Sequence, residues 1–124
     1  MLLEWLNIDF SVAKWIGAHE ITDLGRFSFW SRTDHELSLV CPTKLLPGDV
    51  EVYEDGWSCF RVVGQMEFSM VGILAKISEC LAKNGISIFA VSTFDTDYIL
   101  IKKEKSVEVQ VALEALGYSF MERI

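Results

Sequence analysis

The chain lacks the features that mark membrane and secreted proteins. It has no apolar run near the roughly 20 residues that span a bilayer, and its start carries Glu4 and Asp9 where a signal peptide needs a basic segment and an uncharged core. The cysteines, Cys41, Cys59 and Cys80, are widely spaced and include no CxxC pair, which favours reduced thiols over disulfides or a zinc site. We therefore expect a cytoplasmic protein without membrane contact.

Basic residues are also scarce in this chain. Its 124 residues include 11 lysines and arginines against 18 aspartates and glutamates, which gives a net charge of −7. An excess of negative charge disfavours binding to nucleic acid and to anionic membrane surfaces. Apolar residues make up 51% of the chain, enough for one compact domain or two very small ones. Small molecules and other proteins remain as partners.

Motifs for catalysis and metal binding are missing. Asp95 and Asp97 form an Asp-x-Asp pair, but no glycine and distal glutamate follow at the spacing of a calcium-binding EF-hand loop. The His-Glu pairs that begin at His19 and His35 lack a second histidine four residues later, so we interpret them as surface residues. The chain also contains no Gly-x-Ser-x-Gly sequence, phosphate loop or dinucleotide fingerprint. We therefore expect no enzyme activity, no metal and no cofactor.

The second half of the chain has a regular order of expected elements. These are a strand over 57–64, a helix from Met70 to Asn84 capped by Ser69, strands over 86–94 and 98–103, a helix from Ser106 to Gly117 and a last strand over 118–123. We expect Ser106 to cap the second helix. The order β-α-β-β-α-β is that of the ferredoxin-like unit, a four-stranded antiparallel sheet with both helices on one face.

The first half resembles a degenerate copy of the second. Residues 31–40 align with residues 92–101 at an offset of 61, so that Glu36 stands opposite Asp97. The segments between the strands of this first copy are too short for more than a turn or two of helix. A repeated order of elements makes this short match more informative than its few identities alone.

These patterns together predict an α+β, ferredoxin-like protein with two tandem units. We expect the first unit, over 1–55, to have degenerate helices and the second, over 56–124, to be complete. Because no Gly/Ser/Pro-rich linker separates the halves, we expect them to pack side by side.

Residues 72–101, GILAKISECLAKNGISIFAVSTFDTDYILI, resemble the signature of a small family of tandem ACT-domain proteins. Residues 29–41 and 56–75 also resemble this family, and the resemblance covers residues 6–122. The mammalian cytosolic arginine sensors look like two such chains fused. This resemblance implies ferredoxin-like ACT modules that bind a free amino acid, usually at an interface between two modules, and it implies a homodimer.

The resemblance also implies which residues hold the ligand. Backbone N–H groups of the loop before the first helix would receive the ligand carboxylate, and in this chain they belong to Met70, Val71, Gly72 and Ile73. The turn after the second strand would supply Thr93, Phe94 and Asp97, with Asp95 and Thr96 beside them. Asp97 would meet the ammonium group. The matching loop holds a single acid, Glu67, so an uncharged or apolar ligand side chain is favoured over arginine.

Physical chemistry supports the same roles without the resemblance. Unpaired N–H groups and the helix dipole at a helix N-terminus attract a carboxylate, and a glycine such as Gly72 lets a ligand approach the backbone. The alternative role for Gly72 is close packing of the helix on the sheet. For Asp95 and Asp97 the alternative is turn chemistry, since aspartate caps its own backbone in tight turns.

Two further expectations concern the location of the site and a rival function. We expect the turn at 93–96 to lie at the sheet end opposite the start of the first helix, so that the ligand binds between modules, with one site per chain. The rival function is an ACT-like interaction module that dimerises or modulates a partner enzyme without a ligand. Its exposed apolar face would include some of the tryptophans, Trp5, Trp15, Trp30 and Trp57.

Overall fold

The computed structural model describes residues 2–63 and 72–121, and the contacts divide the chain into two compact units. Unit 1 comprises Met1–Asn7 and Ser58–Ile124, and unit 2 comprises Ile8–Trp57. Strands β1 (Leu2–Trp15) and β4 (Val52–Val62) contribute residues to both units. The boundary expected between residues 55 and 56 lies inside β4, and the division into 1–55 and 56–124 remains a proposal.

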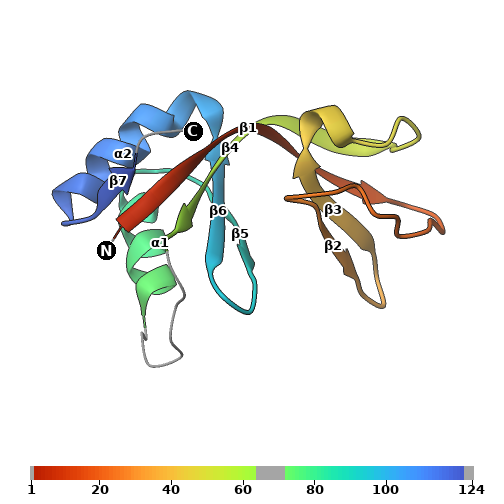
Figure 1. Cartoon of the computed structure of the whole chain (residues 1–124), viewed down its shortest axis with the longest axis horizontal. Helices are drawn as coiled ribbons and strands as arrows, with labels where there is room; N and C mark the ends of the chain where they lie inside the picture. The colour runs from red at the N-terminus through yellow and green to blue at the C-terminus, as the bar shows by residue number, and fades with distance from the viewer. Residues whose placement is uncertain (1, 64–71, 122–124) are drawn as a thin grey trace. The chain divides into compact units, whose positions relative to one another are not determined.

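Unit 1 contains the expected order β-α-β-β-α-β from β4 onward. Its further elements are α1 (Ile73–Lys83), β5 (Phe89–Ser92), β6 (Asp97–Lys102), the 3₁₀ turn η2 (Lys103–Lys105), α2 (Ser106–Ala115) and β7 (Ser119–Met121). Both helices lie on one face of the sheet (Figure 1), as the ferredoxin-like order predicts. None of the described helices is both long and apolar enough to cross a membrane.

Within residues 2–63 and 72–121, the sheet of unit 1 has one strand more than the expected four. Its order is β7-β1-β4-β6-β5, so the start of β1 lies between the last strand and the first strand of the predicted unit. β1 pairs with β7 in parallel, with Leu2 opposite Ser119, and Val63 N–H donates to the Leu2 carbonyl at 2.9 Å. The physical reason is burial, because Leu3 and Trp5 belong to the core of this unit.

The core of unit 1 lies between the helices and one face of the sheet. Side chains from β1, β4, β6, both helices and the segment between α1 and β5 form it: Leu3, Trp5, Phe60, Val62, Ile77, Leu81, Ile86, Ile99, Ile101, Val109 and Leu113. Ile77 and Leu81 of α1, and Val109 and Leu113 of α2, are four residues apart, which is the spacing of one helix face. Alternate residues of each strand therefore face the helices.

The helix ends differ from the sequence prediction in two places. α1 begins at Ile73 rather than Met70, and the expected cap Ser69 lies outside the described residues. Ser106 is the first residue of α2 instead of its cap, because its hydroxyl donates to the Lys103 carbonyl at 2.7 Å. The end of α1 at Asn84 is confirmed.

All residues of unit 2 are described, and they form no α-helix. It contains β2 (Phe29–Arg32), β3 (Leu37–Pro42) and the 3₁₀ turn η1 (Thr43–Leu45), with strand order β2-β3-β1. Its core consists of Trp15, Leu37, Leu39 and Cys41, with Leu24, Trp30, Leu46 and Val50 packed against them.

The sequence does not indicate the contacts that His19 makes in unit 2. Its ring stacks on Trp15 with centroids 4.2 Å apart, and its Nε2 lies 2.9 Å from a carboxylate oxygen of Asp49. Its side chain is 19% exposed, so His19 lies at the surface of unit 2 but is only partly exposed. His35 is a surface residue, with 87% of its side chain exposed.

The two units repeat a hairpin at an offset of 60 residues, not the 61 that the sequence alignment indicated. β2 and β5, β3 and β6, and η1 and η2 all have bounds that differ by 60. Leu37 rather than Glu36 is therefore the counterpart of Asp97. A shift of one residue matters in a strand because it exchanges the two faces.

Candidate functional site

The turn between β5 and β6 is closed by the side chain of Thr93. Thr93 N–H donates to the Thr96 carbonyl at 2.8 Å, Thr93 Oγ1 donates to the same carbonyl at 3.0 Å, and Thr96 N–H donates back to Thr93 Oγ1 at 3.3 Å. Phe94, at the tip, is 79% exposed, and Asp95 beside it is also exposed. The turn therefore has a defined backbone that presents two side chains outward.

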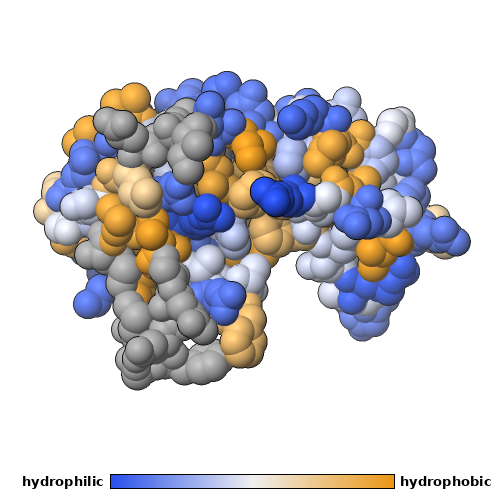
Figure 2. Space-filling model, viewed as in Figure 1, coloured by the Kyte–Doolittle hydropathy of each residue, from blue (hydrophilic) through white to orange (hydrophobic). Residues whose placement is uncertain are grey.

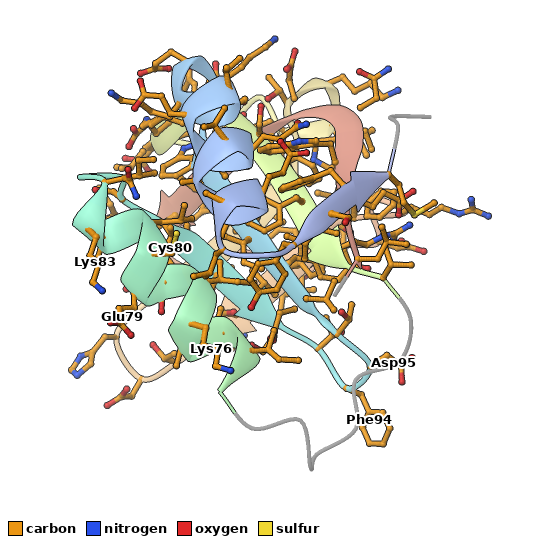
Figure 3. All side chains as sticks on the ribbon, turned by 90° about the vertical axis from the view of Figure 1, so that its left-hand side faces the viewer. Lys76, Glu79, Cys80, Lys83, Phe94 and Asp95 are labelled. Atoms are coloured by element: carbon orange, nitrogen blue, oxygen red, sulfur yellow. The ribbon has the colours of Figure 1, made fainter. Side chains whose placement is uncertain are left out.

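This turn lies at the same end of the sheet as the start of α1, so the expected opposite placement is wrong. Thr96 Oγ1 donates to the Val62 carbonyl at 2.8 Å, which ties the turn to the last residue of β4. The reason is topological: a β-α-β crossover makes β4 and β5 parallel, so both strands finish at one end of the sheet. Figure 3 shows Lys76, in the first turn of α1, and Phe94 and Asp95 toward this end.

Gly72 is the N-cap of α1 and has a left-handed backbone, with φ of 88°. A Cβ built on it would meet no atom within 4 Å, so close helix packing does not explain the glycine, and its conformation does. No side chain caps the helix among the described residues. Ile73, the first helical residue, packs against the core. Met70, Val71 and Glu67 lie outside the described residues.

Asp97 is the first residue of β6, and only 7% of it is exposed. By strand alternation it shares the face of Ile99 and Ile101, which belong to the core beneath the helices. Within the described part of the chain, no hydrogen bond or ion pair joins its side chain to another group. Aspartate is seldom buried to this degree, which makes a role beyond turn formation reasonable.

The structure brings some of the predicted residues together. Gly72, Ile73, Thr93 and Asp97 lie toward one end of unit 1, with Gly72 and Asp97 both on the helix side of the sheet. Phe94 is exposed at the tip of the turn, and Asp95 lines a separate cavity together with Arg61 and Tyr98. The arrangement offers a helix N-terminus to a carboxylate and a buried acid to an ammonium group.

A groove that sequence reasoning missed runs along α1. It has a volume of about 620 Å³, and Ile73 and Tyr118 are among the residues that line it. Lys76, Cys80 and Lys83 line it from α1 (Figure 3). Burial, followed by the nearby Cys80, raises the pKa of Tyr118. The sequence contains no signal for this groove, because its second wall comes from the turn between α2 and β7.

The cysteines are poor candidates for reactive groups. Cys41 and Cys59 are fully buried in β3 and β4, and burial raises the pKa of Cys41 to about 11 and that of Cys59 to about 12. All three thiols are free. Among the described residues, no group of three or more His, Cys, Asp or Glu side chains is arranged to hold a metal ion.

Solved structures similar to this chain share its fold across almost its full length. The protein Atu0741 from Agobacterium tumefaciens is 35% identical, covers 97% of this chain with 91% of its own length, and superposes with a TM-score of 0.87. The protein VC0802 from Vibrio cholerae, of unknown function and described as a possible transport protein, is 22% identical, with coverage of 91% and 87% and a TM-score of 0.67.

The fold also occurs in a regulatory subunit. The regulatory subunit of aspartate kinase from Thermus thermophilus, in its ligand-free form, is 11% identical, with coverage of 90% and 95% and a TM-score of 0.61. Among curated proteins, none matches this chain. The family model of the ACT domain matches residues 52–116, more than half of the chain. Together with the 35% identity over nearly the whole length, this match shows that the chain belongs to the ACT-domain family.

Proposed function

We propose that this protein is a non-enzymatic regulator that binds a free amino acid at an interface between ACT units. The observation that supports this most is the placement of two complementary groups toward the same end of unit 1, on the helix side of its sheet. Gly72 is the N-cap of α1, where no side chain of the described residues caps the helix, and Asp97, a largely buried residue, lies on the helix side of the sheet. A zwitterion needs both kinds of partner.

In this proposal the ligand carboxylate accepts hydrogen bonds from N–H groups at the start of α1, those of Met70, Val71, Gly72 and Ile73. The ammonium group meets Asp97, and Thr93 and Phe94 border the ligand from the turn. Thr96 supports these residues by tying the turn to β4. An uncharged or apolar ligand side chain suits the core residues that surround this end of the sheet.

We also propose that the protein acts as a homodimer of two-unit chains in the cytoplasm, with one site per chain. Regulatory ACT modules of this fold occur in multi-chain enzymes such as aspartate kinase, and ACT modules usually bind amino acids where two modules meet. Binding would then change the equilibrium between assembly states and so reach a partner protein.

A thermal-shift screen with the standard amino acids tests the proposal. We expect at least one amino acid to raise the melting temperature at millimolar concentration, since a ligand that binds only the folded state stabilises it. Asp97→Ala is expected to abolish this increase while the protein stays folded. Asp34→Ala, in the corresponding turn of unit 2, is the control and should retain it. An increase that persists in Asp97→Ala refutes the ammonium assignment.

One observation favours the rival function, an interaction module without a ligand. On α2, Val107 is 77% exposed and Val111 is 62% exposed, and Figure 2 shows apolar surface at the position of this helix. Paired apolar residues on an exposed helix face are typical of contact surfaces. The tryptophans do not contribute strongly, because Trp5, Trp15 and Trp57 are buried. A screen in which no amino acid raises the melting temperature would favour this function.

A further inference from the structure

The segment between β1 and β2, residues 16–28, contains neither helix nor strand, and we call it the strap (Figure 1). Loops of this length without secondary structure are uncommon in compact domains and often have a function. Leu24 of the strap packs against the core of unit 2, a unit without α-helices. The indole N–H of Trp30 donates to the Thr22 carbonyl at 3.0 Å. The strap therefore covers apolar side chains of unit 2.

His19 holds the strap through both nitrogens of its ring. Its Nε2 lies 2.9 Å from Asp49 Oδ2, and its Nδ1 lies 2.7 Å from the carbonyl oxygen of Glu20. An ionised carboxylate and a carbonyl oxygen can only accept hydrogen bonds. A neutral imidazole has a single N–H, so it would leave a nitrogen lone pair facing one of these two oxygens. Both contacts are satisfied together when the ring carries two N–H groups and a positive charge.

The groups around the His19 ring suit this charge. From β1, Trp15 stacks on the ring with centroids 4.2 Å apart, and the centroid of Trp30 from β2 lies 6.3 Å away. The face of an aromatic ring attracts a cation. The turn after η1 contributes the Asp49 carboxylate, and Arg32 of β2 donates from Nη2 to the main-chain carbonyl of His19 at 3.1 Å, not to its ring. The protonated ring therefore has a carboxylate, a carbonyl and an aromatic face as its neighbours.

We infer that protonation of His19 keeps the strap closed on the core of unit 2, and that loss of this proton opens the strap locally. Contacts that need the proton stabilise the closed strap at low pH. They are lost as the pH rises through the range in which histidine titrates, roughly pH 5–8. Opening uncovers the core that Leu24 packs against, which consists of Trp15, Leu37, Leu39 and Cys41. The exposure of an apolar surface on unit 2 therefore depends on pH.

This inference does not depend on the proposed amino-acid site. All of its residues belong to unit 2, whereas the proposed site belongs to unit 1. Unit 2 also contains a second histidine–aspartate pair that serves as a comparison. His35 Nε2 lies 3.5 Å from Asp34 Oδ2 in the turn between β2 and β3, outside the strap, and the two side chains are 87% and 84% exposed. A pH response of the strap should therefore follow His19 and not His35.

Hydrogen exchange of the tryptophan indole N–H groups, measured by NMR on the full chain, tests the inference. The Trp30 indole reports on the strap through its bond to Thr22. The Trp5 indole donates to Gln110 Oε1 at 2.9 Å in unit 1, and it corrects for the intrinsic pH dependence of exchange. We expect the ratio of the Trp30 rate to the Trp5 rate to rise about three- to tenfold between about pH 5.5 and about pH 8. An unchanged ratio would overturn the inference.

Asp49→Asn is the sharpest variant, because an amide can accept from a protonated Nε2 and can donate to an unprotonated one. Its strap should stay closed across this pH range, so the ratio should remain constant. Asp34→Asn, the matched change beside His35, should keep the natural rise. A rise that persists in Asp49→Asn, or that disappears in Asp34→Asn, would refute the role of His19.

A second variant removes the proton itself. His19→Phe keeps an aromatic ring beside Trp15 but has no N–H group, so its ratio should be high at both pH values and should not change between them. His35→Phe is the control and should behave as the natural chain does. A low ratio in His19→Phe at either pH would mean that the strap closes without the proton, which contradicts the inference and leaves the proposed function intact.

Discussion

The hairpins β2–β3 and β5–β6 have the same backbone but different chemistry. Thr33 N–H donates to the Glu36 carbonyl at 2.9 Å, as Thr93 N–H donates to the Thr96 carbonyl at 2.8 Å, and both threonine hydroxyls accept from the turn. The first buried position of the second strand, however, is Leu37 in unit 2 and Asp97 in unit 1. The backbone of the turn therefore does not require the carboxylate.

The proposed amino-acid site depends on this difference between the two units. Unit 2 covers its hairpin with an apolar cluster around Trp15 and Trp30, without α-helices. Unit 1 covers the equivalent face with α1 and α2, and it places a carboxylate where unit 2 has an aliphatic side chain. A helix N-terminus and a buried acid exist together in unit 1 alone, which agrees with one amino-acid site per chain.

The largest expected effect comes from placing a carboxylate in unit 2 at position 37, the counterpart of Asp97 in unit 1. Leu37→Asp places a carboxylate in a cluster of Trp15, Leu39 and Cys41 that has no helix N-terminus beside it. An unpaired buried charge should lower the free energy of unfolding by about 4 kcal/mol. Urea denaturation measures this change, and Leu37→Ala controls for the lost apolar volume. A loss no greater than that of Leu37→Ala would show that the position tolerates a charge.

The buried thiols of the two units predict a loss of stability at high pH. The pKa of each thiol is 9.0 when unperturbed, and burial raises it to about 11 for Cys41 and about 12 for Cys59. Above pH 9 the unfolded chain releases these protons and the folded chain keeps them, so stability falls as pH rises. By pH 11 the fall should be about 2 kcal/mol for Cys41, whose folded pKa lies there, and nearer to about 3 kcal/mol for Cys59.

Two cysteine variants separate the contributions of the units to this pH dependence. Urea denaturation between pH 8 and about 11 should show a smaller fall with pH for Cys41→Ala and for Cys59→Ala than for the natural chain. From about pH 11 upward the fall should continue in Cys41→Ala, which retains Cys59, and should level off in Cys59→Ala. Equal pH dependence in all three proteins would contradict the burial of the thiols.

The reverse exchange should stabilise unit 1 and remove its function. Asp97→Leu replaces a buried carboxylate by the residue that the other hairpin has at this position, which should raise the free energy of unfolding by about 1–2 kcal/mol. Amino-acid binding in the thermal-shift screen should be lost in the same variant. Denaturation and ligand titration measure both properties, and a destabilised Asp97→Leu would show that the carboxylate serves the fold.

The smallest expected effect is equal in the two hairpins. Thr33→Val and Thr93→Val each remove a hydroxyl that accepts from the turn backbone, and each should cost about 1 kcal/mol. Urea denaturation of both variants measures this effect. A clear difference between the two would mean that the turns, despite their matching hydrogen bonds, contribute unequally to stability.

The spacing of apolar residues predicted most strands and both helices of unit 1. This spacing is a local signal, because it depends on residues that are close together in the chain. Helix caps were predicted less well, since the N-cap of α1 is Gly72, through its backbone conformation, and Ser106 bonds to Lys103 rather than capping α2. The offset of the repeat was wrong by one residue because identical letters aligned Ser31 with Ser92, whereas the turn hydrogen bonds align the threonines.

The sequence by itself determined the order of elements, the ACT resemblance and the acidic turn, since each depends on residues close together in the chain. Tertiary structure alone decided which acid faces which side of the sheet, because register separates Asp97 from Asp95. It also decided that Glu4 meets Arg61, 57 residues away, because Leu3 and Trp5 bury the start of the chain beside β4. Long-range burial of this kind has no local signal.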